Sequence, residues 1–271
     1  MSGSIGFESR EVKFVLDSEN NPIDVILKKS LCTNKLVEEF MLLANKTISK
    51  HIVKKIVKPP FVYRVHDKPN NDRLKELSYI VKKLGYKLDL NSKNLSKSIN
   101  FLLESVKNKE EALLIETLAV RCMAKAVYST NNIGHFGLAF NLYSHFTSPI
   151  RRYPDLIVHR ILNSFDNKSK LLSKDILDSI CNHCSEQEKK ATSAERNSIK
   201  YMQVNFLKNN IGSIYSGVIS GVTDWGIYVE ITENMCEGLV KVSSMKGDHF
   251  VFNQKNFRQT WCLIKKLSIF A

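Results

Sequence analysis

The stretch YSHFTSPIRRYPDLIVHR, Tyr143–Arg160, combines two prolines, two adjacent arginines and several hydroxyl and imidazole groups. Pro149 and Pro154 do not fit inside one regular helix, because proline lacks the amide hydrogen that an interior helical position donates. Proline is well tolerated at the first helical position, so the sequence predicts a helix that begins at Pro154. Arg151 and Arg152 then lie in the turn just before a helix N-terminus.

A turn of this kind suits an anion. Free amides and the positive end of the helix dipole point outward there, and guanidinium groups add bidentate donors that match phosphate. The alternative is a local salt bridge between Arg152 and Asp155, so phosphate binding is favoured for Arg151 and left open for Arg152. Tyr143 and His145 could bond sugar or phosphate oxygens, or equally satisfy buried backbone groups, and for His145 the structural role is favoured.

The composition indicates a globular protein with a polyanionic partner. The chain has 271 residues, 43% of them apolar, which is enough for one large domain or two. Lys and Arg number 40 against 27 Asp and Glu, and this excess favours nucleic acid. The six cysteines are scattered, and we find neither a signal peptide nor an apolar run that would span a bilayer. These features predict a cytoplasmic protein with no membrane partner.

The spacing of apolar residues changes along the chain. Residues 1–31 alternate as in strands around the turn Ser18–Pro22, which predicts a β-hairpin. From Asn34 the period is helical, and one apolar stripe lies opposite the charged residues. The stripe consists of Leu36, Val37, Phe40, Met41, Ala44 and Ile48. Prolines then make the segment 58–72 an extended connector.

Helical patterns follow the connector. One helix carries the apolar residues of the segment Leu74–Leu84 and is stopped by Gly85. Two more are predicted over 92–106 and 109–128, and a further helix over 156–165 follows a loop-rich segment. Loops that are dense in hydrogen-bonding groups are common places for functional sites.

The last helical part is predicted as two helices. Ser173 opens the first, which turns Ile176, Leu177 and Ile180 inward. Ser185 and Glu188 match a capping box, which predicts a fresh helix over 186–207. Beyond residue 211 the period returns to two, and three strands are expected. The fold class is therefore α+β, with a mostly helical block over 1–208 and a β block over 211–271.

The signature GHFGLAFNLYSHFTSPIRRYPDLIVHR, Gly134–Arg160, resembles the ribonuclease II and ribonuclease R exoribonucleases, with ribonuclease R the nearer of the two. Lys35–Asn45, Ile180–Gln203 and Gly3–Phe14 resemble the same family in the same order. The resemblance covers roughly residues 3–255. It implies the C-terminal part of an RNB catalytic domain, followed by an S-one RNA-binding domain of the OB-fold type.

The family hydrolyses RNA processively from the 3′ end and releases 5′-mononucleotides with the help of Mg²⁺. By matching position, Arg151 resembles the arginine that holds the scissile phosphate, and Glu195 the acid in the catalytic cavity. Glu38 resembles a residue that touches the terminal ribose, and Phe7 one side of the aromatic clamp on the last base. The alternatives are surface or capping glutamates for Glu38 and Glu195, and a core aromatic for Phe7.

In this family four clustered aspartates hold Mg²⁺, and they lie upstream of the part that this chain resembles. The aspartates of this chain are dispersed, and the nearest pair, Asp175 and Asp178, is typical of a solvated helix face. Zinc at Cys181, His183 and Cys184 is disfavoured, since a second ligand pair is missing and a core helix stripe accounts for both cysteines. No metal ligands are therefore predicted in the chain.

We expect a fragment that binds single-stranded RNA 3′ ends and is inactive alone, with a separately encoded N-terminal half as a potential partner. The alternative is a non-catalytic RNA-binding or regulatory protein. In the β block, Trp225 and Tyr228 offer rings for base stacking, although Trp225 could simply pack against its turn. Only three of the five strands of an OB barrel are recognisable, so the barrel is expected to be incomplete.

Overall fold

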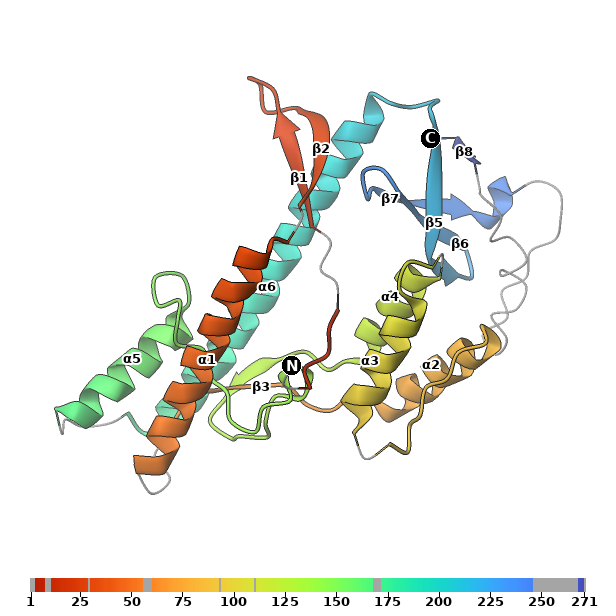
Figure 1. Ribbon diagram of the computed structural model, residues 1–271. Helices are drawn as coiled ribbons and strands as arrows, with labels where there is room; N and C mark the ends of the chain where they lie inside the picture. Colours follow the sequence, from red (N-terminus) through yellow and green to blue (C-terminus); the bar gives the residue numbers. More distant parts are fainter. Residues whose placement is uncertain are drawn as a thin grey trace.

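The computed structural model describes residues 3–7, 11–28, 30–55, 60–92, 94–109, 111–167, 172–245 and 268–270 (Figure 1). The helices are α1 Cys32–Lys55, α2 Asn71–Lys83, α3 Leu95–Val106, α4 Ala112–Cys122, α5 Tyr153–Asp166 and α6 Lys174–Lys208. The strands are β1 Glu11–Leu16, β2 Pro22–Lys28, β3 Tyr63–Val65, β4 Val127–Ser129, β5 Ile214–Thr223, β6 Gly226–Ile231, β7 Glu237–Lys241 and β8 Ser268–Phe270. Helices and strands are thus mixed, as expected. In the described part of the chain, we find no helix with the length and apolarity needed to cross a bilayer.

The N-terminal segment forms the predicted hairpin, but the first half of α1 is less buried than predicted. Strands β1 and β2 are antiparallel, and β2 contacts α6 (Figure 1). On α1, Ile52 is fully buried and Ile48 packs against the core. Leu36, Val37 and Phe40 are 58–64% exposed, so the predicted apolar stripe is not buried over the first turns of α1. No described element buries that face of the helix.

The first hydrophobic core joins α5 and α6 to a short two-stranded sheet. Phe61, Ile157 and Leu177 are all buried to within 1% of complete burial. Strands β3 and β4 pair antiparallel at its centre. The predicted connector 58–72 therefore contains a strand, and the helix predicted over 109–128 ends at Cys122. The residues that follow α4 bond to a partner strand more than sixty positions away, which a local pattern does not reveal.

The second hydrophobic core lies between α2, α3 and α4. Val81, Ile99 and Ile115 are completely buried within it. Asn70 caps α2, because its side chain accepts hydrogen bonds from the amides of Asp72 and Arg73. Gly85 follows the end of α2 with φ +87°, a left-handed conformation that suits glycine. The end of α2 before Gly85 agrees with the sequence prediction, whereas the Asn70 cap was not predicted.

Helix α6 is continuous over 35 residues, whereas the sequence predicted two helices. Ser173 caps it as predicted, and its side chain accepts from the amide of Ile176 at 3.4 Å. Ser185 does not open a new helix: its hydroxyl donates to the Cys181 carbonyl at 2.8 Å and accepts from the Tyr128 amide at 3.0 Å. Cys181 and Cys184 belong to the first core, as the helix stripe predicted, but Ile176 is 51% exposed.

The C-terminal sheet has the order β7-β6-β5-β8 and is antiparallel. The three predicted strands are present, and residues 268–270 add a fourth that pairs with the start of β5. The described strands form an open sheet and not a closed barrel. Gly226 permits β6 to approach β7 closely, since a Cβ there would lie 2.3 Å from the Val240 carbonyl oxygen. Gln203 and Lys200 donate to backbone carbonyls of this sheet and so join it to α6.

Substitutions of two phenylalanines, one buried and one exposed, test the assignment of the first core. Phe61 is completely buried, whereas Phe101 on α3 is 72% exposed. We expect Phe61→Ala to lower the free energy of unfolding by about 3–5 kcal/mol, because it leaves a cavity that the core closes only in part. Phe101→Ala is the control and should change that free energy by about 0.5 kcal/mol or less. Urea unfolding followed by circular dichroism measures both, and equal effects would contradict the assignment of this core.

Candidate nucleic-acid interface

The arginine pair lies on a tight turn that leads into α5. The Ser148 carbonyl accepts hydrogen bonds from the amides of Arg151 and Arg152, at 3.3 and 3.0 Å. Arg152 is the N-cap residue with an extended backbone, and Pro154 stands in the first turn of the helix. Helix α5 begins at Tyr153, one residue before the predicted start. The predicted position of the two arginines, directly before a helix N-terminus, is therefore correct.

Asp155 stabilises this turn through hydrogen bonds from below its backbone. Its side chain is completely buried, and Oδ1 accepts from the Ser148 amide and from Arg152 Nη2, each at 2.8 Å. The local salt bridge that the sequence left open for Arg152 is thus present. Arg151 is exposed, and no hydrogen bond or ion pair joins its side chain to another described residue. Of the two guanidinium groups, that of Arg151 is the one presented to solvent.

Asn45 of α1 fixes the loop on the other side of the turn, although the sequence pattern did not single it out. Its side chain is 2% exposed, and Oδ1 accepts from the amides of Phe146 and Thr147 at 2.9 and 3.2 Å. Its Nδ2 donates to the Tyr143 hydroxyl at 3.1 Å. An amide on the apolar stripe of this helix, between Ala44 and Ile48, was the available signal, because a buried amide must find partners.

Two buried tyrosines and a half-buried imidazole support the loop. Tyr143 is 5% exposed, and the Tyr128 hydroxyl lies 3.0 Å from His145 Nδ1. Burial lowers the pKa of His145 from 6.5 to about 2, with the charges of Arg152 and Arg64 acting in the same direction. Burial likewise raises the pKa of Tyr128 to about 12. These groups are neutral near pH 7 and lie beneath the exposed turn, while direct RNA contacts by Tyr143 and His145 stay a prediction.

Arg64 connects this cluster to α6. Its guanidinium forms a two-bond ion pair with Glu188, at 2.6 and 2.9 Å, and lies over the Tyr128 ring at 4.6 Å from the centroid. Bidentate pairs of this geometry are among the stronger charge-assisted contacts. Glu188, which the sequence pattern placed in a capping box, serves instead to bind Arg64.

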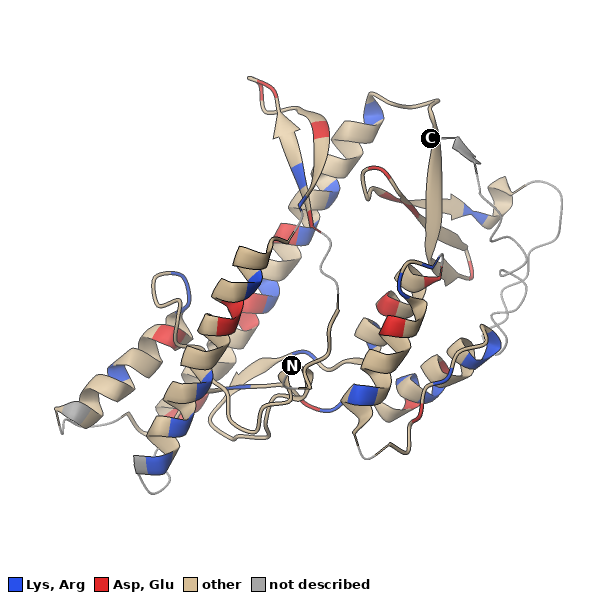
Figure 2. Ribbon diagram, in the orientation of Figure 1, with Lys and Arg blue, Asp and Glu red and all other residues tan. Residues whose placement is uncertain are grey.

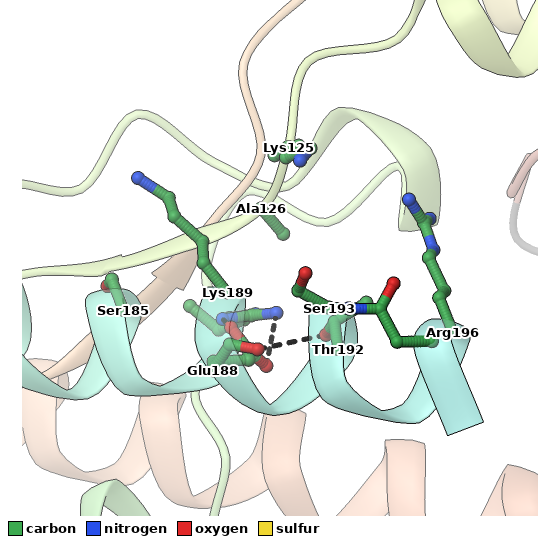
Figure 3. Close-up of a pocket in the computed structure, with 10 residues that line it drawn as sticks. Lys125, Ala126, Ser185, Glu188, Lys189, Thr192, Ser193 and Arg196 are labelled. Atoms are coloured by element: carbon green, nitrogen blue, oxygen red, sulfur yellow. Dashed lines mark hydrogen bonds and ion pairs between the residues drawn. The ribbon is translucent and has the colours of Figure 1, made fainter. Parts of the chain in front are cut away.

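A groove of about 460 Å³ lies between α6 and the segment that leads into β4 (Figure 3). Its charged lining residues are Arg64, Lys125, Glu188, Lys189 and Arg196, accompanied by Ala126, Ser185, Thr192, Ser193 and Asn197. The sequence did not predict this groove, because its two walls are about sixty residues apart in the chain. Over the whole molecule, Figure 2 shows Lys and Arg spread along α1, α2 and α6 and not gathered on one element.

We find no contact, among the described residues, between the arginine turn and the remaining predicted site residues. Glu38 on α1 and Glu195 on α6 are both exposed. Phe7 is half-buried and packs against the second core, as its alternative interpretation required. Trp225 is 61% exposed in the turn between β5 and β6, and Tyr228 is half-buried on β6. RNA contacts by these residues stay predictions.

The described residues do not fit a magnesium site. Among them, no three His, Cys, Asp or Glu side chains converge closely enough to hold a metal ion. Mg²⁺ requires several oxygen ligands in nearly octahedral geometry, and carboxylates normally supply part of them. The described part of the chain therefore offers Mg²⁺ no set of ligands.

The fold that carries the arginine turn is that of an RNB domain. Residues 1–168 match the RNB domain family, and the chain belongs to that family. It is 36% identical to ribonuclease R of Aquifex aeolicus over 264 residues, which cover 94% of this chain and 36% of that protein. The chain thus spans about a third of the length of such curated relatives.

Solved structures of ribonuclease R share the fold. The Mycoplasma genitalium enzyme in complex with ribose-methylated single-stranded RNA has a TM-score of 0.84 and 30% identity, over 94% of this chain and 40% of that one. The same enzyme in complex with double-stranded RNA has a TM-score of 0.80 and 30% identity, over 88% of this chain and 43% of that one.

The half-buried ring of His145 predicts a pH dependence of stability. Its folded pKa is about 2, so between pH 6.5 and 2 the unfolded chain binds a proton there that the folded chain does not. Stability is therefore lost as the pH falls below 6.5, by about 2 kcal/mol at pH 5 for this group. Urea unfolding at pH 8 and pH 5 should show a loss that is about 2 kcal/mol smaller in His145→Asn. The same loss in both proteins would contradict the burial of a neutral ring.

Proposed function

We propose that this chain is a portion of a processive 3′-to-5′ hydrolytic exoribonuclease and that its own residues bind the 3′ end of single-stranded RNA. The observation that carries the proposal is Arg151, an exposed guanidinium on a turn that two buried side chains hold in place. A free guanidinium beside a helix N-terminus is well suited to phosphate. Membership of the RNB family supports the same ligand, as does the single-stranded RNA in complex with the Mycoplasma genitalium relative.

Within this proposal Arg151 holds the scissile phosphate. Arg152 Nε is buried without a hydrogen-bond partner among the described residues, so this guanidinium retains a donor although Asp155 occupies another. Glu38 contacts the terminal ribose and Glu195 is the acid of the catalytic cavity, each at an exposed helical position. Tyr143 and His145 act through the loop by keeping its backbone in one conformation. Phe7 packs against the second core, so its ring must move out of that core before it can stack on the last base.

Cleavage in this proposal depends on the aspartates that the family resemblance implies, which other polypeptide sequence supplies. Those carboxylates, and not residues of this chain, would hold Mg²⁺, which would supply activation of the water nucleophile and neutralisation of developing charge. The 271-residue chain contributes RNA binding, and alone it is expected to lack exonuclease activity. We place this function in the cytoplasm.

An apolar face on α1 is where the complementary polypeptide docks in this proposal. Leu36, Val37, Phe40 and Leu43 are each 58–64% exposed and recur at helical spacing. An exposed stripe of this size is typical of an interaction surface. Since the relatives are about three times as long as the matched part, the occupant we propose is the aspartate-rich part of an RNB domain.

The β block is proposed as an S-one type RNA-binding unit of the OB-fold class over residues 211–271, with the RNB part over 1–208. Exposed Trp225 offers a ring face, and Tyr228 lies on the less buried side of β6. Stacking of a base on such a ring contributes about 1–3 kcal/mol.

The second candidate function is a non-catalytic RNA-binding or regulatory protein. The same exposed Arg151 favours it, because phosphate binding does not require a metal. The two functions differ in one outcome, since the regulatory protein binds RNA but gains no nuclease activity when the aspartate-rich polypeptide is added.

Arg151→Ala should weaken binding of an unstructured oligoribonucleotide with a free 3′ end by about 1–3 kcal/mol, the range for a charge-assisted contact. Arg160→Ala is the matched control, because Arg160 is an exposed arginine on α5 whose guanidinium faces the Tyr153 ring. Fluorescence anisotropy measures both affinities. Equal affinities for the wild type and Arg151→Ala would mean that the turn serves the fold alone.

The purified chain should release no mononucleotides from a 3′-overhang RNA, and adding the aspartate-rich half of a ribonuclease R should produce release. Phe40→Glu should abolish this gain, because a buried carboxylate without a partner is costly. Phe101→Glu, at a similarly exposed phenylalanine on α3, should keep it. Steady release by the chain alone, or an unaffected gain in Phe40→Glu, would refute this arrangement.

A further inference from the structure

The segment Gly3–Phe7 is fastened to α3 by a single side chain. Asn100 Nδ2 donates to the Ser4 carbonyl at 2.8 Å, and Asn100 Oδ1 accepts from the Gly6 amide at 3.1 Å. The carbonyl of one residue and the amide of the second residue after it point to the same edge of an extended chain. The Asn100 amide therefore takes the place of a neighbouring strand along this edge.

The opposite edge of the same segment is bonded to the short 3-10 helix Phe136–Leu138. The Ile5 amide donates to the Gly137 carbonyl at 2.9 Å. The Gly137 amide donates in turn to His66 Nδ1 at 2.8 Å, so the proton of this ring is on Nε2, which lies 2.7 Å from the Ala124 carbonyl. A Cβ at position 137 would lie 3.0 Å from His66 Nδ1, and glycine permits this close approach. The segment is thus anchored on both edges.

Phe7 directly follows the last anchored residue. Its half-buried ring packs against the second core, and the bond from the Gly6 amide to Asn100 restrains the backbone one residue earlier. The ring can therefore leave the core by rotation of its side chain while the backbone before it keeps its place. A side chain on a backbone that is already ordered loses less conformational entropy when it binds a ligand.

We propose that Asn100 is a positioning residue for the stacking of Phe7 on the last base of the RNA. The inference rests on the proposed function, in which Phe7 is one side of the clamp on that base. Asn100 contacts neither the base nor a phosphate in this arrangement, and it acts through the backbone of the segment that carries Phe7. The alternative is a purely structural role, in which the two bonds only attach the segment to α3.

The test uses the full 271-residue chain and two oligoribonucleotides that differ only at the 3′ end, one with adenine on the last ribose and one with an abasic last ribose. The ratio of the two affinities, measured by fluorescence anisotropy, reports the stacking of the last base. Phe7→Ala should lower this ratio about 5-fold or more, because it removes the stacking ring. Asn100→Ala should lower it about 3- to 10-fold, because stacking must then order a loose segment.

A double variant separates positioning from a structural role. If Asn100 acts through Phe7, Asn100→Ala should cause no further fall of the ratio in the Phe7→Ala background. A purely structural role lowers the amount of folded protein for both RNAs alike and leaves the ratio unchanged. Asn100→Asp keeps the acceptor for the Gly6 amide and loses the donor to the Ser4 carbonyl, so its ratio should lie between those of the wild type and Asn100→Ala.

Glu104→Ala is the control, because Glu104 is an exposed residue one turn further along α3. It should change the ratio less than about twofold. If the ratio in Asn100→Ala equals or exceeds that of the wild type while Arg151→Ala weakens binding of both RNAs, the positioning role fails and the proposed function stands. If the wild type binds neither RNA, both fail. Where Asn100→Ala does not fold, a wild-type ratio in Asn100→Asp contradicts the inference and a lowered one supports it.

Discussion

The arginine turn depends on one buried carboxylate at the start of a helix. Asp155 has no exposed surface, yet it holds the Ser148 amide and the Arg152 guanidinium at 2.8 Å each. The N-terminal end of α5 favours this negative charge, because unpaired amides and the helix dipole are positive there. A carboxylate buried in this way is tolerated only with its partners present. As a consequence, Arg152 stabilises the turn through its ion pair with Asp155, and the guanidinium of Arg151 has no ion pair with a described residue.

A second constraint comes from α1, at the other side of the same loop. Asn45 replaces the missing backbone partners of two loop amides and also bonds Tyr143, so a helix about a hundred residues upstream sets the loop conformation. Preorganisation of this kind matters for binding, because a loop that is already ordered loses less entropy when a ligand arrives. The neutral rings of Tyr143 and His145 contribute in the same sense, since neither brings a competing charge close to the arginines.

Helix α6 connects the first hydrophobic core to the C-terminal sheet. At about 1.5 Å per residue, its 35 residues span roughly 50 Å. Along that length it contributes Leu177 to the first core, Glu188 to the ion pair with Arg64, and Gln203 to the C-terminal sheet. A break near Ser185 would have uncoupled these contacts. The continuous helix instead carries all three contacts and also forms one wall of the groove.

The sequence by itself determined the features that depend on residues close in the chain. These are the hairpin, the end of α2 at Gly85, the Ser173 cap, and the start of α5 next to Pro154, just after the two arginines. Short-range hydrogen bonding and backbone sterics decide these, so the pattern is visible locally. The tertiary structure alone decided which charges are free. Arg64, Arg152 and Arg196 look alike in the sequence, but the first two bond to Glu188 and Asp155, and the third has no such partner among the described residues. Whether a cation is free depends on which carboxylate the fold brings to it, and for Arg64 that partner lies 124 positions away.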